Sequence, residues 1–194
     1  MHERAAKPLG GKAYGSIPHM PGSKRGPGDH GIDEQQASII TGEPRRGMRV
    51  YVQEKLDGTC MSVAKIDGQI VALGRKGHPA SGAPYEHMRA FATWVAERRG
   101  RFDRLLADGE RVVGEWLLMA TSIRYRVLDA DALFVAFDIM RDGERALVLD
   151  VEDRCEECRV DFVGSLCLVD DGRDIYGVRD HERLLLQFAG RPDV

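Results

Sequence analysis

The sequence predicts an α+β domain in which helices pack on antiparallel β-sheets. Asp67-Gly68 separates two apolar, β-prone runs at 60–66 and 69–73. An Asp-Gly pair between such runs is a strong signal for a two-residue hairpin, because both turn positions favour positive φ. Across 84–99, apolar residues recur at intervals of three and four, which is typical of an amphipathic helix. Strands and helices in this order favour the α+β class.

The remaining elements are expected from shorter runs. In chain order they are a short helix at 33–40, a strand at 50–55, a short helix at 102–107, strands at 110–119, 132–140, 146–151, 160–169 and 174–178, and a terminal helix at 179–189. Gly100 is expected to end the long helix, since glycine commonly follows a helix C-terminus. The strand at 50–55 would place Lys55 at the end of one strand of an antiparallel sheet.

Composition divides the chain into three regions. Residues 1–47 are rich in Gly, Pro and charge and are expected to form a loop-rich leader. Residues 48–141 carry the regular patterns and are expected to form the core, followed by a divergent or truncated C-terminal segment at 142–194. With 194 residues, 43% hydrophobic and 30% charged, the chain is long enough for one globular domain with a sizeable core.

Charge and hydropathy limit the kinds of partner. A formal net charge of -3 argues against a protein that coats nucleic acid by bulk electrostatics, since such domains are usually strongly basic. No apolar run reaches the roughly 20 residues of a bilayer crossing, so a cytoplasmic protein without membrane contact is expected. Basic clusters could line a local groove or lie on solvated helix faces. These clusters are Arg45, Arg46 and Arg49, then Arg75 and Lys76, then Arg98, Arg99, Arg101 and Arg104.

The four cysteines leave two interpretations open. The first residues are polar and form no export signal, so reduced thiols or metal ligands are expected rather than disulfides. Cys155 and Cys158 have the short spacing of a zinc hook, which Cys167 and His181 would complete. Free thiols in a variable region are the alternative.

The stretch Glu54-Lys55-Leu56-Asp57-Gly58 is the most informative of the chain. A lysine at this point, between two strand-like runs, could present an amine nucleophile beside a phosphate. A free lysine has a pKa near 10.4, so holding an amine neutral at pH 7 costs about 4 to 5 kcal/mol. A carboxylate neighbour would raise that pKa, so Asp57 is interpreted as a positioning residue, and Gly58 as a turn that approaches a nucleotide closely. The alternative is a surface lysine before an ordinary Asp-Gly turn.

Two further motifs follow Lys55-Leu56-Asp57-Gly58. They are Gly114-Glu115-Trp116-Leu117 and Phe134-Val135-Ala136-Phe137-Asp138. In these motifs the sequence resembles the covalent nucleotidyltransferase superfamily, which contains ATP-dependent DNA ligases, RNA ligases and mRNA capping enzymes, and it looks most like the RNA-ligase branch of bacteria and phages. A leader from Tyr14 to His30 also looks like one found in bacterial members. The resemblance spans residues 12–141 and implies a nucleotidyltransferase (ATP-grasp-like ligase) domain.

The resemblance implies a role for each candidate residue. Lys55 would attack the α-phosphate of ATP, release pyrophosphate and hold AMP through a phosphoramidate bond. Glu54 would read the adenine edge, and Arg75 would lie near the ribose and the substrate phosphates. Glu115 would contact the ribose hydroxyls or the metal shell, and Phe137 would stack on adenine.

Each of these roles has a structural alternative. Glu54 could be a solvent-facing strand residue and Arg75 a plain surface arginine. Glu115 could be an edge-strand carboxylate, although a carboxylate in an apolar strand should be paired or at a site, because unpaired burial is expensive. An aromatic such as Phe137 is usually core. Phe134 is the better core candidate, since residues three apart on a regular strand point to opposite faces.

The implied activity is that of an ATP-dependent RNA ligase that uses ATP and Mg²⁺ and joins RNA ends, with DNA ends less favoured. The family also has a Glu-Gly motif and a later Lys-x-Lys pair; neither is found, and the last lysine is Lys76. Truncation or a changed reading frame after residue 141, loss of activity, or a partner polypeptide that supplies the missing motifs would explain this. The alternative functions are an inactive nucleotide- or RNA-binding module and a capping-type guanylyltransferase.

Overall fold

The computed structural model describes residues 6–42, 49–119, 123, 125, 127, 129–170 and 173–175. These residues fall into two compact units. The first unit contains the described residues of Met1–Tyr14 and Lys55–Val163, and the second those of Gly15–Glu54 and Gly164–His181. Helices and mostly antiparallel strands make up both, so the predicted α+β class is confirmed.

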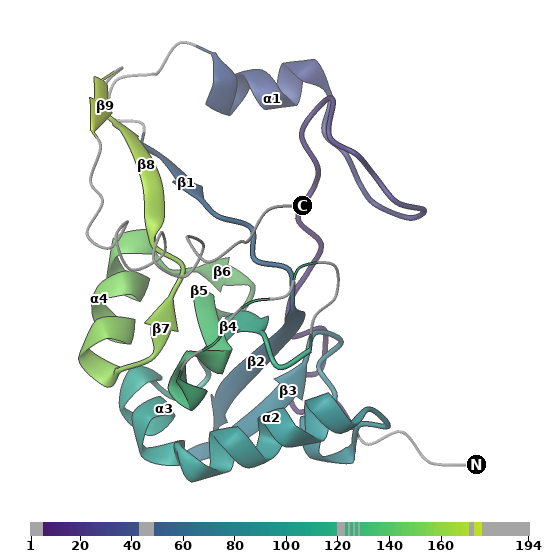
Figure 1. Ribbon diagram of the computed structural model, residues 1–194, viewed down its shortest axis with the longest axis vertical. Helices are drawn as coiled ribbons and strands as arrows, with labels where there is room; N and C mark the ends of the chain where they lie inside the picture. The colour runs from purple at the N-terminus through teal and green to yellow at the C-terminus, as the bar shows by residue number, and fades with distance from the viewer. Residues whose placement is uncertain are drawn as a thin grey trace. The chain divides into compact units, whose positions relative to one another are not determined.

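A six-stranded sheet forms the first unit (Figure 1). Its strands are β2 (Thr59–Ile66), β3 (Gln69–Gly74), β4 (Arg111–Trp116), β5 (Phe134–Arg141), β6 (Glu144–Arg145) and β7 (Asp161–Phe162). The order is β3-β2-β4-β5-β6, all antiparallel, with the short β7 pairing in parallel with β5. The predicted hairpin is confirmed, because Asp67 and Gly68 join β2 to β3 with φ of 49° and 70°.

The helices of the first unit are α2 (Glu86–Glu97), α3 (Arg99–Leu105) and α4 (Val148–Cys158), with short 3₁₀ turns η1 (Ala80–Gly82) and η2 (Ala130–Leu133). The long helix ends at Arg98, whose ψ of 17° leaves the helical range; Gly100 lies inside α3, so the prediction that it ends the helix was wrong. The predicted strand at 146–151 was also wrong. Val151, Cys155 and Cys158 recur at helical spacing and turn one face of α4 to the core.

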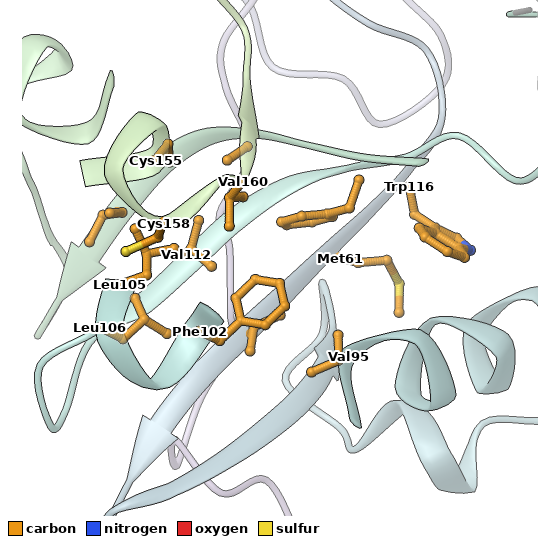
Figure 2. Close-up of a cluster of buried hydrophobic side chains, with 14 of the residues drawn as sticks. Met61, Val95, Phe102, Leu105, Leu106, Val112, Trp116, Cys155, Cys158 and Val160 are labelled. Carbon is orange, nitrogen blue, oxygen red and sulfur yellow. The ribbon is translucent and has the colours of Figure 1, made fainter. Parts of the chain in front are cut away.

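The three helices supply side chains to one large core on a single face of the sheet. Phe91, Trp94 and Phe102 come from α2 and α3, and Trp116 and Phe134 come from the strands beneath them. Their ring centroids lie 5.2 to 6.3 Å apart, the range of favourable aromatic pairs. Figure 2 shows Cys155 and Cys158 of α4 among the side chains of this cluster.

An N-terminal segment, residues 6–14, supplies side chains to the other face of the sheet. Ala13 and Tyr14 are buried there, against residues of β2, β3, β4 and β5. The backbone N–H groups of both residues donate to the carbonyl oxygen of Arg75, at 3.1 and 3.2 Å. The buried Arg111 donates from Nε to the carbonyl oxygen of Ala13 at 2.7 Å. The segment is therefore fixed at Ala13 and Tyr14, by the residue that follows β3 and by Arg111 of β4.

The second unit contains α1 (Glu34–Thr41) and a three-stranded antiparallel sheet of β1 (Arg49–Gln53), β8 (Ser165–Asp170) and β9 (Arg173–Ile175) in the order β1-β8-β9. The predicted helix at 33–40 is confirmed and starts at a capping box between Asp33 and Gln36. The strand predicted to end at Lys55 stops at Gln53 and pairs with β8, not with the hairpin strands.

The other C-terminal predictions have mixed outcomes. The strand expected at 160–169 is two strands, β7 and β8, separated by Val163 and Gly164. The strand expected at 174–178 corresponds to β9, and the helix expected at 179–189 lies outside the described residues. None of the described helices combines the length and hydropathy needed to cross a membrane.

Candidate functional site

The loop at 54–58 connects β1 to β2 and carries the predicted nucleophile. Leu56 is buried, whereas Lys55 is exposed, so the loop is anchored by its apolar residue and presents its amine to solvent. The backbone N–H of Asp57 donates to Oη of Tyr125 at 2.8 Å. Glu54 is half-buried, and burial raises its pKa above the ordinary value; it belongs to the second unit.

Gly58 brings this loop against the end of β4. Its N–H donates to the carboxylate of Glu115, and a Cβ at this position would lie 2.7 Å from the carbonyl oxygen of Trp116 and 3.0 Å from Cδ2 of Leu117. A backbone oxygen cannot move aside as the end of a flexible side chain can. Glycine is therefore required by the approach of the loop to β4, which joins the first predicted motif to the second.

Replacing Gly58 with alanine should lower the free energy of unfolding by about 1 to 3 kcal/mol, the usual cost of overpacking. The shift of the loop should also weaken nucleotide binding. Chemical denaturation of the parent and the variant measures the first effect. Gly82→Ala is the matched control, because its Cβ would meet no atom within 4 Å. Equal stability of Gly58→Ala and the parent would contradict the prediction.

Three polar residues form a row across the end of the sheet, on the face opposite the helices. Cys60 of β2 lies directly opposite Glu115 of β4, and cross-strand partners share a face. Arg75 follows Gly74, the partner of Met61, and so continues the row on the other side of Cys60. Burial, then the nearby Glu115, raises the pKa of Cys60 to about 12, while Arg75 opposes the shift. The row therefore contains a neutral thiol between a carboxylate and a guanidinium.

Glu115 is the carboxylate of this row, and its pKa is strongly perturbed. Burial raises its pKa to about 7; Lys55 is the largest opposing influence, and the Gly58 N–H and Arg75 also oppose the shift. Asp57 adds to the increase. Because each of these groups affects the pKa of Glu115, the structure brings together Lys55, Asp57, Gly58, Arg75 and Glu115. A perturbed carboxylate among charged groups is a common feature of functional sites.

The raised pKa of Glu115 makes stability depend on pH. The folded protein retains a proton on Glu115 up to about pH 7, whereas an unperturbed glutamate loses it near 4.5. Folding therefore takes up a proton between these values, and this contribution to stability is lost as the pH rises through them. Relative to Glu115→Gln, the parent should lose on the order of 1 kcal/mol between pH 4.5 and 7.5, since solvent screens a partly exposed group. Urea denaturation across this range measures the difference, and two parallel curves would contradict it.

Phe137 lies at a β-bulge in β5. Gly114 pairs with Ala136 and Val113 with Asp138, so Phe137 is the extra residue between two ladder pairs. Bulges often re-aim side chains beside active sites. Phe137 packs on the face opposite the helices, with Tyr14 and Cys60. Phe134 is fully buried in the helix-facing core, which confirms that Phe134 is the core aromatic and that the two rings lie on opposite faces.

The cysteines of the zinc hypothesis lie elsewhere. Cys155 and Cys158 belong to α4 and are buried in the core of the first unit, where burial raises the pKa of both thiols, that of Cys155 to about 12. The described part of the chain contains no group of three or more His, Cys, Asp or Glu residues able to hold a metal. His181 and the side chain of Cys167 lie outside the described residues.

An open hollow of about 470 Å³ lies at the C-terminal end of β5 and contains none of the predicted site residues. Its lining mixes both signs of charge: Glu110, Ile139, Met140, Arg141, Asp142, Glu144, Arg145 and Ala146. One of these lining residues, Arg145, forms an ion pair with Asp138 at 2.9 Å. The row of Arg75, Cys60 and Glu115 is the better candidate site, because Arg75 and the nearby Lys55 both act on the pKa of Glu115.

Sequence reasoning gave no role to four residues that contact the predicted site. Tyr14 packs against Phe137, Tyr125 accepts a hydrogen bond from Asp57, Cys60 lies opposite Glu115, and Asp138 follows Phe137 at the bulge. Counting back from the hairpin would have placed Cys60 on the same face as Arg75. Tyr14 and Tyr125 contact residues more than 60 positions away in the sequence, so no local sequence pattern indicates these contacts.

Comparison with known proteins identifies a family by one family model. A family model described as RNA ligase matches residues 48–182. The structure is similar to an archaeal ATP-dependent RNA ligase (form 2), with 19% identity and a TM-score of 0.47 over 67% of this chain and 34% of that one. It is also similar to a Naegleria gruberi RNA ligase solved with PPi, with 20% identity and a TM-score of 0.48 over 78% of this chain and 44% of that one. The chain thus spans less than half the length of these ligases. A search of curated proteins found no match.

Proposed function

The chain belongs to the RNA ligase family of covalent nucleotidyltransferases, and from this membership we propose that it accepts AMP from ATP on Lys55 and passes it to an RNA end. The observation that carries the proposal is the row of Arg75, Cys60 and Glu115 beside the loop of Lys55. This arrangement combines the exposed amine of the loop with a guanidinium and a perturbed carboxylate on one face of the sheet. Residues 48–141 are the proposed nucleotidyltransferase core.

The proposed chemistry assigns these residues to the nucleophile, the phosphates, the base and the ribose. The nitrogen of Lys55, as the neutral amine, forms a bond to the α-phosphorus of ATP as the bond from that phosphorus to the β-phosphate oxygen breaks. Pyrophosphate leaves, and the nitrogen releases a proton to solvent. Arg75 offers a planar fork of donors that suits phosphate oxygens. Phe137 stacks on adenine, Glu54 reads the adenine edge, and Glu115 holds the ribose hydroxyls.

Mg²⁺ is the proposed metal. Magnesium is usually held by one or two carboxylates together with substrate phosphates. Asp57 and Glu115 fit that donor set, since Asp57 is near enough to raise the pKa of Glu115. When bound, the ion would neutralise charge on the triphosphate and on the leaving pyrophosphate. Both residues flank Gly58 in the fold, since Asp57 precedes it and Glu115 accepts its N–H. They would therefore hold the ion beside Lys55.

One observation favours a second function. No lysine follows Lys76 in this sequence, so the late Lys-x-Lys pair of the family has no counterpart in it. A protein that retains the base and ribose contacts without those cations would bind nucleotide or RNA reversibly. Alternatively, a partner polypeptide would supply the missing cations.

Incubation with α-labelled ATP and Mg²⁺, followed by a denaturing gel, distinguishes these functions. Covalent label from ATP supports the ligase, and its transfer to a 5′-phosphorylated RNA end, in preference to a DNA end, supports an RNA substrate. Label from GTP in place of ATP would indicate a capping-type guanylyltransferase. Reversible ATP binding without any covalent label would exclude the adenylation step and support the binding module.

A further inference from the structure

Tyr14 of the N-terminal segment packs directly against Phe137. The two ring centroids lie 5.2 Å apart with an interplanar angle of 70°, an edge-to-face pair. Tyr14 is only 4% exposed, whereas Phe137 remains partly exposed. Tyr14 therefore supports one side of the Phe137 ring and leaves part of that ring accessible.

The backbone of β5 does not by itself determine the direction of the Phe137 ring. As the extra residue of the bulge, Phe137 has no cross-strand partner in β4, and the ladder is locally disrupted at a bulge. Its surroundings are instead the side chains of Tyr14, Val113, Met140 and Cys60. Tyr14 is the aromatic member of this set, and it comes from outside the sheet.

Tyr14 is in turn held by charged neighbours. The guanidinium of Arg145 lies 5.1 Å from the centroid of the Tyr14 ring, within the range of a cation–π contact, and pairs with the buried Asp138 at 2.9 Å. The Tyr14 hydroxyl donates to Oδ2 of Asp138 at 3.4 Å. That distance is long for a hydroxyl donor, so the ring contacts are the stronger restraint. Together with the hydrogen bond from the Tyr14 N–H to the carbonyl oxygen of Arg75, they restrain the Tyr14 ring.

We propose that Tyr14 is a positioning residue that holds the Phe137 ring ready to stack on the nucleotide base. This inference rests on the proposed function, because it takes Phe137 as the surface on which the base stacks. A ring that is already ordered need not lose conformational freedom when the base arrives, and such preorganisation improves affinity. Removing the Tyr14 ring should therefore weaken ATP binding by about 3- to 10-fold.

A double-mutant cycle on ATP affinity tests the proposal. Dissociation constants are measured by calorimetry in the Lys55→Ala background, which prevents covalent transfer, for the Tyr14→Leu, Phe137→Leu and doubly substituted proteins. Tyr14→Leu should raise the dissociation constant about 3- to 10-fold in the presence of Phe137 and less than twofold in its absence, because Tyr14 acts through Phe137. Tyr14→Phe should stay within twofold. Tyr85→Leu is the control, since Tyr85 is 63% exposed and lies at the start of α2.

Three results would overturn the inference: an unchanged dissociation constant in Tyr14→Leu, the same loss with and without Phe137, or a full loss in Tyr14→Phe. If Tyr14→Leu does not fold, Arg145→Leu replaces it, because Arg145 contacts the same ring from a side chain that is 53% exposed. Arg145→Leu should then weaken ATP binding about 2- to 3-fold when Phe137 is present and less when it is absent. Equal losses of affinity with and without Phe137 would reject the inference. The adenylation proposal fails separately, if ATP binds but Lys55 takes no label. A parent protein that does not bind ATP would overturn both.

Discussion

Alanine in place of Lys55 is expected to abolish the covalent AMP label. The phosphoramidate bond needs a nitrogen that can lose a proton, and alanine provides none. Loss of a nucleophile typically lowers the rate by a factor on the order of 10³ or more. Lys55→Arg should be equally inactive although its charge is kept, because a guanidinium remains protonated. Its ATP affinity should stay within about threefold of that of the parent. Denaturing gels after incubation with α-labelled ATP measure the first effect, and calorimetry measures the second.

Lys65 provides the matched control for this experiment. It is also a lysine of the first unit, and its amine is paired with Asp103 at 2.8 Å. Lys65 lies near the end of β2 that is farther from the loop of Lys55. Lys65→Ala should retain the covalent label at the level of the parent. Persistence of label in Lys55→Ala would assign the nucleophile to another residue and would remove the basis of the adenylation proposal.

Replacing each of the two phenylalanines of β5 with alanine should affect mainly a different property: stability for Phe134 and ATP binding for Phe137. Phe134 is fully buried and touches the rings of Phe91, Trp94 and Phe102, so Phe134→Ala should lower the free energy of unfolding by about 3 to 5 kcal/mol. Phe137→Ala should have a smaller effect on stability but lose about 1 to 3 kcal/mol of ATP binding, the range for base stacking.

Chemical denaturation and calorimetry on the same two variants separate these effects. Each variant is the control of the other, because both remove the same atoms from the same strand. If Phe137→Ala proved the more destabilising of the two and left ATP affinity unchanged, Phe137 would be a core residue and the proposed stacking role would be lost.

The parts of the fold that sequence predicted are those that depend on neighbours in the chain. The β2–β3 hairpin follows from Asp67-Gly68, and α2 follows from its apolar period, since both signals lie within the element itself. The pairing of β1 with β8 joins residues more than 100 positions apart, and nothing local indicates it. The helix α4 was missed because buried cysteines, rather than aliphatic residues, complete its apolar face.

The candidate site divides in the same way. The motifs around Lys55 and Glu115 are contiguous in sequence, and the register of β2 and β4 then places Cys60 opposite Glu115. The extra residue at Phe137 is a property of strand pairing, and it becomes visible only when both strands are aligned in space. The burial that raises the pKa of Glu115 likewise comes from the assembled sheet, so sequence could indicate the carboxylate but not its protonation.

The way the N-terminal segment is fastened to the sheet affects how the protein should be produced. The RNA ligase match begins at residue 48, and a fragment cut there would look complete by alignment. Such a fragment would nevertheless leave the side chains of Val113 and Met140 uncovered and the guanidinium of Arg111 without its acceptor at Ala13. Expression boundaries chosen from the alignment alone would thus remove side chains that cover this face of the sheet, and recombinant fragments should keep residues 6–14.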